Sequence, residues 1–140
     1  MIARVAAVVS VAILAAIVAF QSALILGAPW GALTQGGRGD GALDTPGRVV
    51  AAVSIAVLVL FALALLGRVG GGPLRARRRL ARVGSWIAVG YGVVAVLLNA
   101  ATPSARERAI WLPVSILLLT AELVTVLGSR RSPGPSADRP

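Results

Sequence analysis

The sequence predicts an all-α membrane protein, a bundle of four transmembrane helices with both termini on the cytoplasmic side. Two observations lead to this fold class: the chain is very apolar, and its arginines gather beside the apolar runs. Of the 140 residues, 57% are hydrophobic and only 14% are charged, whereas a soluble domain usually has about 25% charged residues. A soluble domain of this length could not bury so much apolar surface, so we expect a lipid bilayer to cover it.

Four apolar runs approach the roughly 20 helical residues that cross the hydrocarbon core of a membrane. They cover residues 5–26, 49–66, 83–100 and 109–127. None alternates between apolar and polar positions as a barrel strand does, and only helices or closed barrels satisfy the backbone within lipid. We therefore expect one membrane domain over residues 1–131, followed by a disordered cytoplasmic tail, residues 132–140, rich in Pro and Ser.

Arginine counts in the short connections predict the orientation, because cytoplasmic loops carry the excess of basic residues. One connection, between the second and third runs, contains Arg68, Arg75, Arg77, Arg78, Arg79 and Arg82. Arg4 and the arginines near the C-terminus would lie on the same side of the membrane. The opposite side has fewer arginines, and acidic residues dilute them. We therefore expect both termini in the cytoplasm.

The first apolar run has an alternative interpretation as a cleaved signal peptide, since it follows a positive start and ends near Gly27 and Ala28. A signal h-region spans roughly 7–15 residues, and this run is longer, so we expect it to be retained. The chain lacks lysine and is rich in Ala, Val, Gly and Arg, which is typical of GC-rich bacterial genomes. We expect a multi-pass protein of the bacterial inner membrane.

The residue types limit the chemistry that the chain can perform. There is no His and no Cys, which removes the commonest general base, a common metal ligand and all thiol chemistry. No metal-ligand spacing or catalytic constellation stands out, so we expect no cofactor, no metal and no enzymatic activity. The net charge is +9, but the arginines flank apolar runs, so anionic lipid headgroups rather than nucleic acid are the expected partner.

Glu122 is the residue of the apolar runs that most suggests function. It lies roughly 9 Å from the cytoplasmic end of the fourth run, at 1.5 Å per residue, where a carboxylate is costly. We expect it to pair with a snorkelling Arg82 or Arg4, or to bond Ser10 or Tyr91 at similar depth. One interpretation is a proton or cation relay. The other, which we favour, is a single polar contact between helices, because no second buried acid or base extends a relay.

Small residues form a stripe along the third run. Gly84, Ala88 and Gly92 are spaced four apart, and such spacing lets helix backbones approach closely. One interpretation is packing within a single four-helix bundle, which we favour. The other is the seam of a homodimer.

Ser104 and Glu107 have the spacing of a capping box. In that motif the Ser104 hydroxyl accepts a bond from the Glu107 amide, and the Glu107 carboxylate accepts one from the Ser104 amide. The pattern predicts that the fourth helix begins near Ala105. Trp30 and Trp111 are expected at the outer membrane interface, and the glycine-rich connection that contains Trp30 is expected to be an ordered turn rather than a binding loop.

The arginine-rich connection is expected to continue into the third helix. Pro73 suits a first helical turn, and apolar residues recur at helical spacing up to Val83, which predicts an amphipathic lead-in on the membrane surface. We interpret the connection mainly as a topology anchor, with a specific anionic-lipid site or a dock for an acidic partner as alternatives. The predicted headgroup contacts are Arg75, Arg77, Arg78, Arg79 and Arg82.

Short motifs in both outer connections bear on the family. They are residues 27–31 and 36–37 after the first run, then Asn99, residues 102–104, 107–108 and 111–113 around the start of the fourth. With these motifs the chain resembles a group of small uncharacterised four-span membrane proteins of actinobacteria. The resemblance covers the spans and both outer connections, and it implies the fold but no activity. The chain also has the size of a small multidrug-resistance transporter, but those proteins have an essential glutamate in the first span.

Two functional hypotheses follow from these observations. The leading one is a structural or accessory membrane protein that packs against itself or against a larger membrane partner. The alternative is a small transporter or channel subunit that uses Glu122, the acid within the fourth run.

Overall fold

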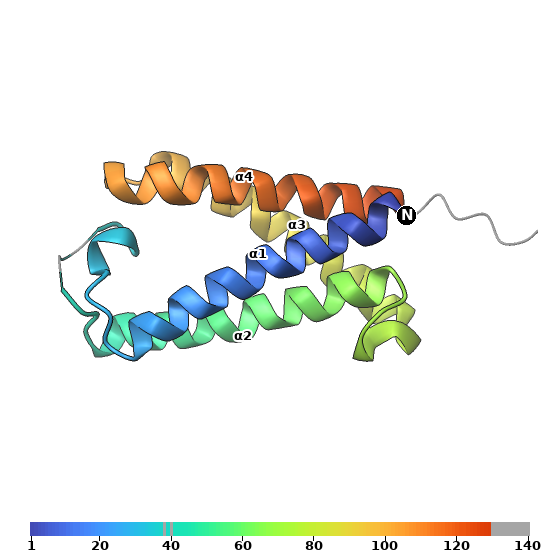
Figure 1. The fold of residues 1–140 in the computed structure, drawn as a ribbon, viewed down its shortest axis with the longest axis horizontal. Helices are drawn as coiled ribbons and strands as arrows, with labels where there is room; N and C mark the ends of the chain where they lie inside the picture. The colour runs from blue at the N-terminus through green and yellow to red at the C-terminus, as the bar shows by residue number, and fades with distance from the viewer. Residues whose placement is uncertain (38, 40, 130–140) are drawn as a thin grey trace, which may run out of the picture.

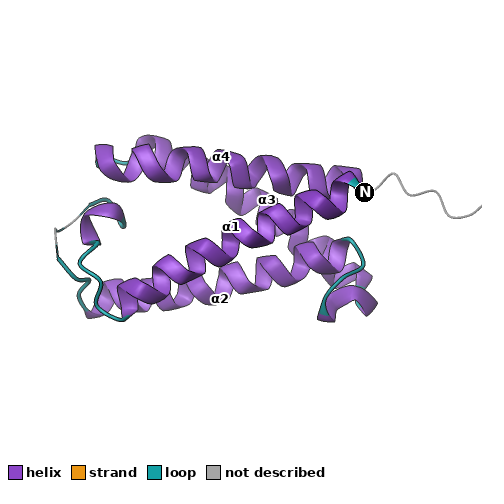
Figure 2. Ribbon diagram, viewed as in Figure 1, coloured by secondary structure: helices purple, strands orange, loops and turns teal. Residues whose placement is uncertain are grey.

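The computed structural model describes residues 1–37, 39 and 41–129, and it consists of long helices joined by short connections (Figure 1). The long helices are α1 (Ile2–Ile25), α2 (Thr45–Arg68), α3 (Arg78–Ala101) and α4 (Ala105–Gly128). Two short 3₁₀ turns, η1 (Gly31–Leu33) and η2 (Pro73–Ala76), lie in the connections. The described residues contain no strand, as Figure 2 shows, so the predicted all-α class is confirmed.

Each long helix can cross a membrane. All four have 24 residues, and their most apolar windows have a mean hydropathy between 1.7 and 3.1. A helix of that length spans about 36 Å, against a hydrocarbon core of about 30 Å. The four helices contain the predicted apolar runs almost completely. Most of the helices are longer than the runs, because polar residues continue the helical backbone past the ends of the apolar stretch. The chain is therefore a multi-pass membrane protein by length and composition.

The helices form one closed bundle. Each packs against its neighbours in sequence, and α1 also packs against α4, which closes the ring. Met1 and Gly128 lie at one end of the bundle together with η2, and we call this the terminal end (Figure 1). The opposite end, formed by the α1–α2 and α3–α4 connections, is called the loop end.

The bundle is packed inside and apolar outside. Its core is a cluster contributed by all four helices: Leu14, Leu58, Phe61, Leu65, Ala88 and Leu118. Many other large apolar side chains point outward, such as Leu60, Leu97 and Leu98, which are each more than 60% exposed. Apolar faces of this extent on every helix are expected of a protein whose surroundings are lipid.

Helix starts at the loop end follow from their capping residues. Asp44 accepts a bond of 2.8 Å from the Gly47 amide and caps α2, while Pro46 fits the first turn. Ser104 accepts a bond of 3.2 Å from the Glu107 amide, so α4 begins at Ala105 as predicted.

The predicted lead-in to the third helix is not continuous, which corrects the expectation of one amphipathic helix from Pro73 to Val83. The turn η2 ends at Ala76, Arg77 has a non-helical backbone (φ −101°, ψ 60°), and α3 begins at Arg78. Adjacent arginines repel one another and the positive end of the helix dipole, which disfavours an unbroken helix through this point. The expected disordered tail, residues 132–140, lies outside the described residues.

Candidate functional site

Glu122 lies inside the bundle. Its side chain is 1% exposed, and six residues separate it from the end of α4 at Gly128, a distance of about 9 Å along the helix. Its Oε2 has no hydrogen-bond partner among the described residues. A buried polar atom without a partner costs about 1–3 kcal/mol, and more when it is charged. The bundle therefore retains an unfavourable group at this position.

Gly92 of α3 makes the space for this carboxylate. A Cβ built on Gly92 would lie 2.8 Å from Glu122 Oε2 and 3.2 Å from the Leu119 Cδ1. The first distance is shorter than real side chains show, so a larger residue at position 92 would force the carboxylate to move. Gly92 and Glu122 therefore form one packing unit between α3 and α4.

Ser10 is at the expected depth but does not bond Glu122. A Cβ on Gly128 would lie 3.1 Å from the Ala3 Cβ, so Ala3 of α1 and Gly128 of α4 lie at the same level. The two helices run in opposite directions, and counting seven residues along each from this contact places Ser10 level with Ala121. Ser10 is fully buried. However, its hydroxyl donates to the Ala6 carbonyl oxygen at 3.0 Å, as a serine in a helix often does.

The other predicted partners of Glu122 lie elsewhere. Tyr91 is 44% exposed, and its ring packs against Phe61 with centroids 5.3 Å apart. Arg4 and Arg82 are exposed at the terminal end. The described part of the chain shows no bond between Glu122 and these three residues, so the predicted cluster is not assembled.

The small-residue stripe of α3 faces the inside of the bundle. A Cβ on Gly84 would lie 2.8 Å from the Ala64 Cβ of α2, and Ala88 is fully buried in the core. Gly92 contacts α4, as described above. The stripe is thus covered by helices of the same chain, in agreement with the favoured interpretation of intramolecular packing.

Glu107 joins the two connections of the loop end. Its side chain is 8% exposed, and its Oε2 accepts bonds from the Gly36 amide at 3.0 Å and from the Thr102 hydroxyl at 2.7 Å. The second half of the predicted capping box is therefore wrong: the carboxylate does not turn back to Ser104. The Ser104 amide instead donates to the Thr102 Oγ1 at 3.4 Å. Glu107 acts as a latch that holds the α1–α2 connection on the bundle.

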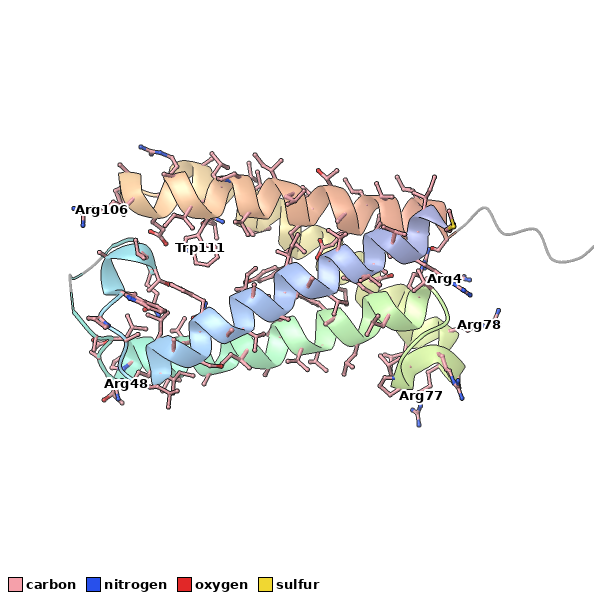
Figure 3. All side chains as sticks on the ribbon, viewed as in Figure 1. Arg4, Arg48, Arg77, Arg78, Arg106 and Trp111 are labelled. Atoms are coloured by element: carbon pink, nitrogen blue, oxygen red, sulfur yellow. The ribbon has the colours of Figure 1, made fainter. Side chains whose placement is uncertain are left out.

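An aromatic cluster supports the same connection. Trp111 projects from α4 and lies beside the α1–α2 connection (Figure 3), and its indole N–H donates to the Leu33 carbonyl oxygen at 2.6 Å. Phe20 meets the Trp111 ring edge-on at 4.8 Å and stacks with Trp30 at 5.8 Å between centroids. These contacts support the ordered-turn interpretation. The sequence did not predict that Phe20 and Leu33 take part, because nothing local links them to Trp111.

A hollow of about 520 Å³ opens at the loop end between the four helices. Its polar lining includes Gln21, Ser54, Tyr91, Asn99, Thr102 and Glu107. The Gln21 Oε1 is buried without a hydrogen-bond partner in the described part of the chain. Among the described residues of its lining, Glu107 is the one acid and there is no base, and no local pattern in the sequence predicts this hollow.

A larger hollow, of about 1970 Å³, lies at the terminal end, and we call it the terminal hollow. It is bordered by arginines from α1, α2, η2 and α3: Arg4, Arg68, Arg75, Arg78 and Arg82. Its apolar wall comes from α3 and α4 and includes Trp86, Leu123, Val124 and Leu127. Arg75, Arg78 and Arg82 were among the predicted headgroup contacts, whereas Arg77 and Arg79 are exposed but do not line the hollow.

Charge is distributed unevenly along the bundle. Figure 3 shows Arg4, Arg77 and Arg78 at the terminal end and Arg48 and Arg106 at the loop end. Of the described acids, Asp44 caps α2 and Glu107 latches the loop end, while Glu122 is buried. The arginines of the terminal hollow are therefore not interspersed with described acidic side chains at the surface.

Arg68 has a structural role in this hollow. Its Nε donates to the Ser129 Oγ at 2.8 Å, and its Nη2 donates to the Val126 carbonyl oxygen at 3.2 Å. Basic side chains at a helix C-terminus bond its last carbonyls and interact favourably with the helix dipole. Arg68 thereby fixes the end of α4 to the end of α2, a contact that the sequence did not reveal.

Comparisons with known proteins add no candidate. No protein-family model, curated protein or solved structure matches the chain. Within the described residues, no group of three or more His, Cys, Asp or Glu side chains comes together to hold a metal ion. The features of the molecule that bear on function are therefore the buried carboxylate and the two hollows.

Proposed function

We propose that this chain is a non-enzymatic accessory protein of the bacterial inner membrane, with its terminal end in the cytoplasm against the anionic leaflet. The supporting observation is the set of described arginines at that end: Arg4, Arg68, Arg75, Arg77, Arg78, Arg79 and Arg82. Basic residues beside transmembrane helices stay on the cytoplasmic side. Each also gains about 1 kcal/mol near an anionic membrane surface. We also propose kinship with the small four-span proteins of actinobacteria.

The loop end supports an accessory role rather than catalysis. Its best-positioned polar side chains join one part of the chain to another, as Glu107 does for Gly36 and as Trp111 does for Leu33. A catalytic group has to be presented to a substrate beside a second group of matched chemistry. Glu107 and Trp111 instead stabilise a short connection on top of the bundle, which a structural role explains.

Reporter fusions test this proposal through the orientation. We expect a periplasm-active phosphatase to work when fused after residue 37, and a cytoplasm-active fluorescent protein to work when fused after residue 129. Replacing Arg75, Arg78 and Arg79 by Gln should allow a fraction of molecules to insert in the opposite orientation. Replacing Arg48 and Arg106 by Gln is the control at the other end, and it should strengthen the original orientation. Fluorescence from a fusion at residue 37 would contradict the proposal.

A second function, movement of protons or cations, is favoured by the unpartnered Oε2 of Glu122. Intramembrane carboxylates commonly mark ion pathways. The test is a pH-sensitive dye inside proteoliposomes under an imposed potential, comparing the unchanged chain, Glu122→Gln and the exposed control Thr120→Val on the same helix. Flux that disappears only with Glu122→Gln would establish the relay. If none of the three proteins shows flux, the relay is excluded and the accessory role is the remaining proposal.

A further inference from the structure

The terminal hollow combines two kinds of surface. Arg78 and Arg82 of α3 border it above Trp86, and Leu123 and Val124 of α4 continue its apolar wall. Trp86 and Val124 are 36% and 37% exposed. The apolar wall is therefore an accessible surface beside the arginines, with contributions from α3 and α4.

The arginines of the terminal hollow favour an anionic ligand. Among the described residues, its lining contains arginines from four separate elements and no acidic side chain. Guanidinium groups bind phosphate oxygens through paired, charge-assisted hydrogen bonds. Among the arginines of the lining, Arg4 and Arg82 come from opposite sides of the end of the bundle, on α1 and α3. Arg78 and Arg82 are four residues apart on α3 and therefore lie on one face of that helix, beside the same hollow that Arg4 borders.

The beginning of α3 adds to the same preference. Its first turn has no acidic residue and no side-chain cap, and Arg77 occupies the cap position. Helix N-termini favour negative charge, so Arg77 and Arg78 are unfavourably placed at this one. A phosphate in the hollow beside Arg78 would reduce that repulsion.

We infer that the terminal hollow binds one anionic phospholipid, with its phosphate among Arg4, Arg78 and Arg82 and an acyl chain along Trp86 and Val124. Small-molecule pockets usually measure about 300–1,000 Å³, and this hollow, at about 1970 Å³, suits an amphiphile better than a free ion. The inference builds on the proposed function, which puts the terminal end in the anionic leaflet. It adds that one lipid is held at a defined site.

Binding is measured on the full chain in detergent, by native mass spectrometry with phosphatidylglycerol as the probe and phosphatidylcholine as the neutral comparison. We expect the double variant Arg78→Gln/Arg82→Gln to bind phosphatidylglycerol roughly tenfold or more weakly, since each arginine contributes about 1 kcal/mol. The matched double variant Arg48→Gln/Arg106→Gln makes the same charge change at the loop end. It should change binding less than about twofold. Equal losses in both variants would overturn the site in favour of a general charge effect.

The apolar wall distinguishes a lipid from free phosphate. Val124→Trp fills the groove and keeps every arginine, so it should weaken phosphatidylglycerol binding and leave binding of glycerol 3-phosphate unchanged. Glycerol 3-phosphate that binds as tightly as the lipid would overturn the acyl-chain part. Far-ultraviolet circular dichroism of each variant confirms that the helices remain folded.

Fluorescence gives a second readout that does not depend on complex stability in the gas phase. Trp86 lines the hollow, whereas Trp30 and Trp111 belong to the loop end. Brominated phosphatidylglycerol should quench fluorescence more than brominated phosphatidylcholine does, and Trp86→Phe should abolish the difference. No difference in the unchanged chain would overturn the site. Because these measurements are made in detergent, they are independent of orientation, and the reporter fusions still test the proposed function separately.

Discussion

Glu122 and Gly92 are in direct opposition across the α3–α4 interface: a Cβ at position 92 would lie 2.8 Å from the Glu122 Oε2. The carboxylate is 1% exposed and that oxygen lacks a partner among the described residues. The helix backbone at Gly92 therefore serves as the wall of a small space that only a residue without a side chain leaves open. Substitutions at the two positions should consequently be coupled.

Gly92→Ala should lower the free energy of unfolding by about 1 kcal/mol, since the new methyl group displaces the Glu122 carboxylate, which lies at the end of a flexible side chain. Gly90→Ala is the matched control on the same helix, because a Cβ there meets nothing within 4 Å, and it should stabilise by up to about 1 kcal/mol through helix propensity. Thermal unfolding in detergent measures both changes. With Glu122→Ala as background, Gly92→Ala should cost much less. An unchanged cost in that background would show that the carboxylate is not what the new methyl group meets.

Gly84→Ala should destabilise the chain without changing its oligomeric state. The new Cβ would lie 2.8 Å from the Ala64 Cβ, so α2 and α3 would have to separate. The double variant Gly84→Ala/Ala64→Gly removes the methyl group that the new Cβ would meet, so it should recover most of the lost stability. Thermal unfolding and native mass spectrometry measure the two effects. A change of oligomeric state with unchanged stability would instead support the homodimer seam.

Glu107→Ala should release the α1–α2 connection. The change removes an acceptor from the Gly36 amide and the Thr102 hydroxyl, and we expect a loss of about 2–3 kcal/mol because these bonds go to a charged group. Hydrogen exchange of residues 31–37 should become faster, while exchange in the middle of the helices stays slow. Arg106→Ala, at an exposed neighbouring position, should leave the exchange of the connection unchanged. Protection that survives Glu107→Ala would show that the latch is not needed.

Trp111→Phe should weaken the same connection by about 1 kcal/mol, because the phenyl ring keeps much of the aromatic contact with Phe20 but cannot donate to the Leu33 carbonyl. Trp30→Phe is the control, since Trp30 is 43% exposed and its stacking on Phe20 survives in a phenyl ring. Hydrogen exchange of residues 31–34 compares the two. Equal effects of both changes would mean that the indole bond contributes nothing.

The helices were predictable because their signals are local. Run length and hydropathy indicated all four, and the Ser104 cap indicated where α4 begins. The Glu107 carboxylate was assigned to the same local cap, but it bonds Gly36, which is 71 residues away in the chain. No spacing rule reaches that far. The partner is decided by how the α1–α2 connection folds over α4.

Glu122 illustrates a second limit. Counting residues along each span predicted that Glu122 and Ser10 lie at a similar depth. The register of α1 against α4 agrees with this prediction. The bond between them did not follow, because a helical serine has an acceptor available four residues earlier in its own backbone. Sequence spacing can place residues at one level of a membrane, but it cannot tell which acceptor a hydroxyl selects.

The concentration of arginines at one end also connects the chain to the energy state of its cell. In the proposed orientation these guanidinium groups lie on the electrically negative side of the membrane. Carrying one elementary charge across costs about 2.3 kcal/mol for every 100 mV of potential. A respiring cell would thus hold the inserted protein in place with its own voltage, whereas collapse of that voltage during insertion would remove one of the forces that select the final topology.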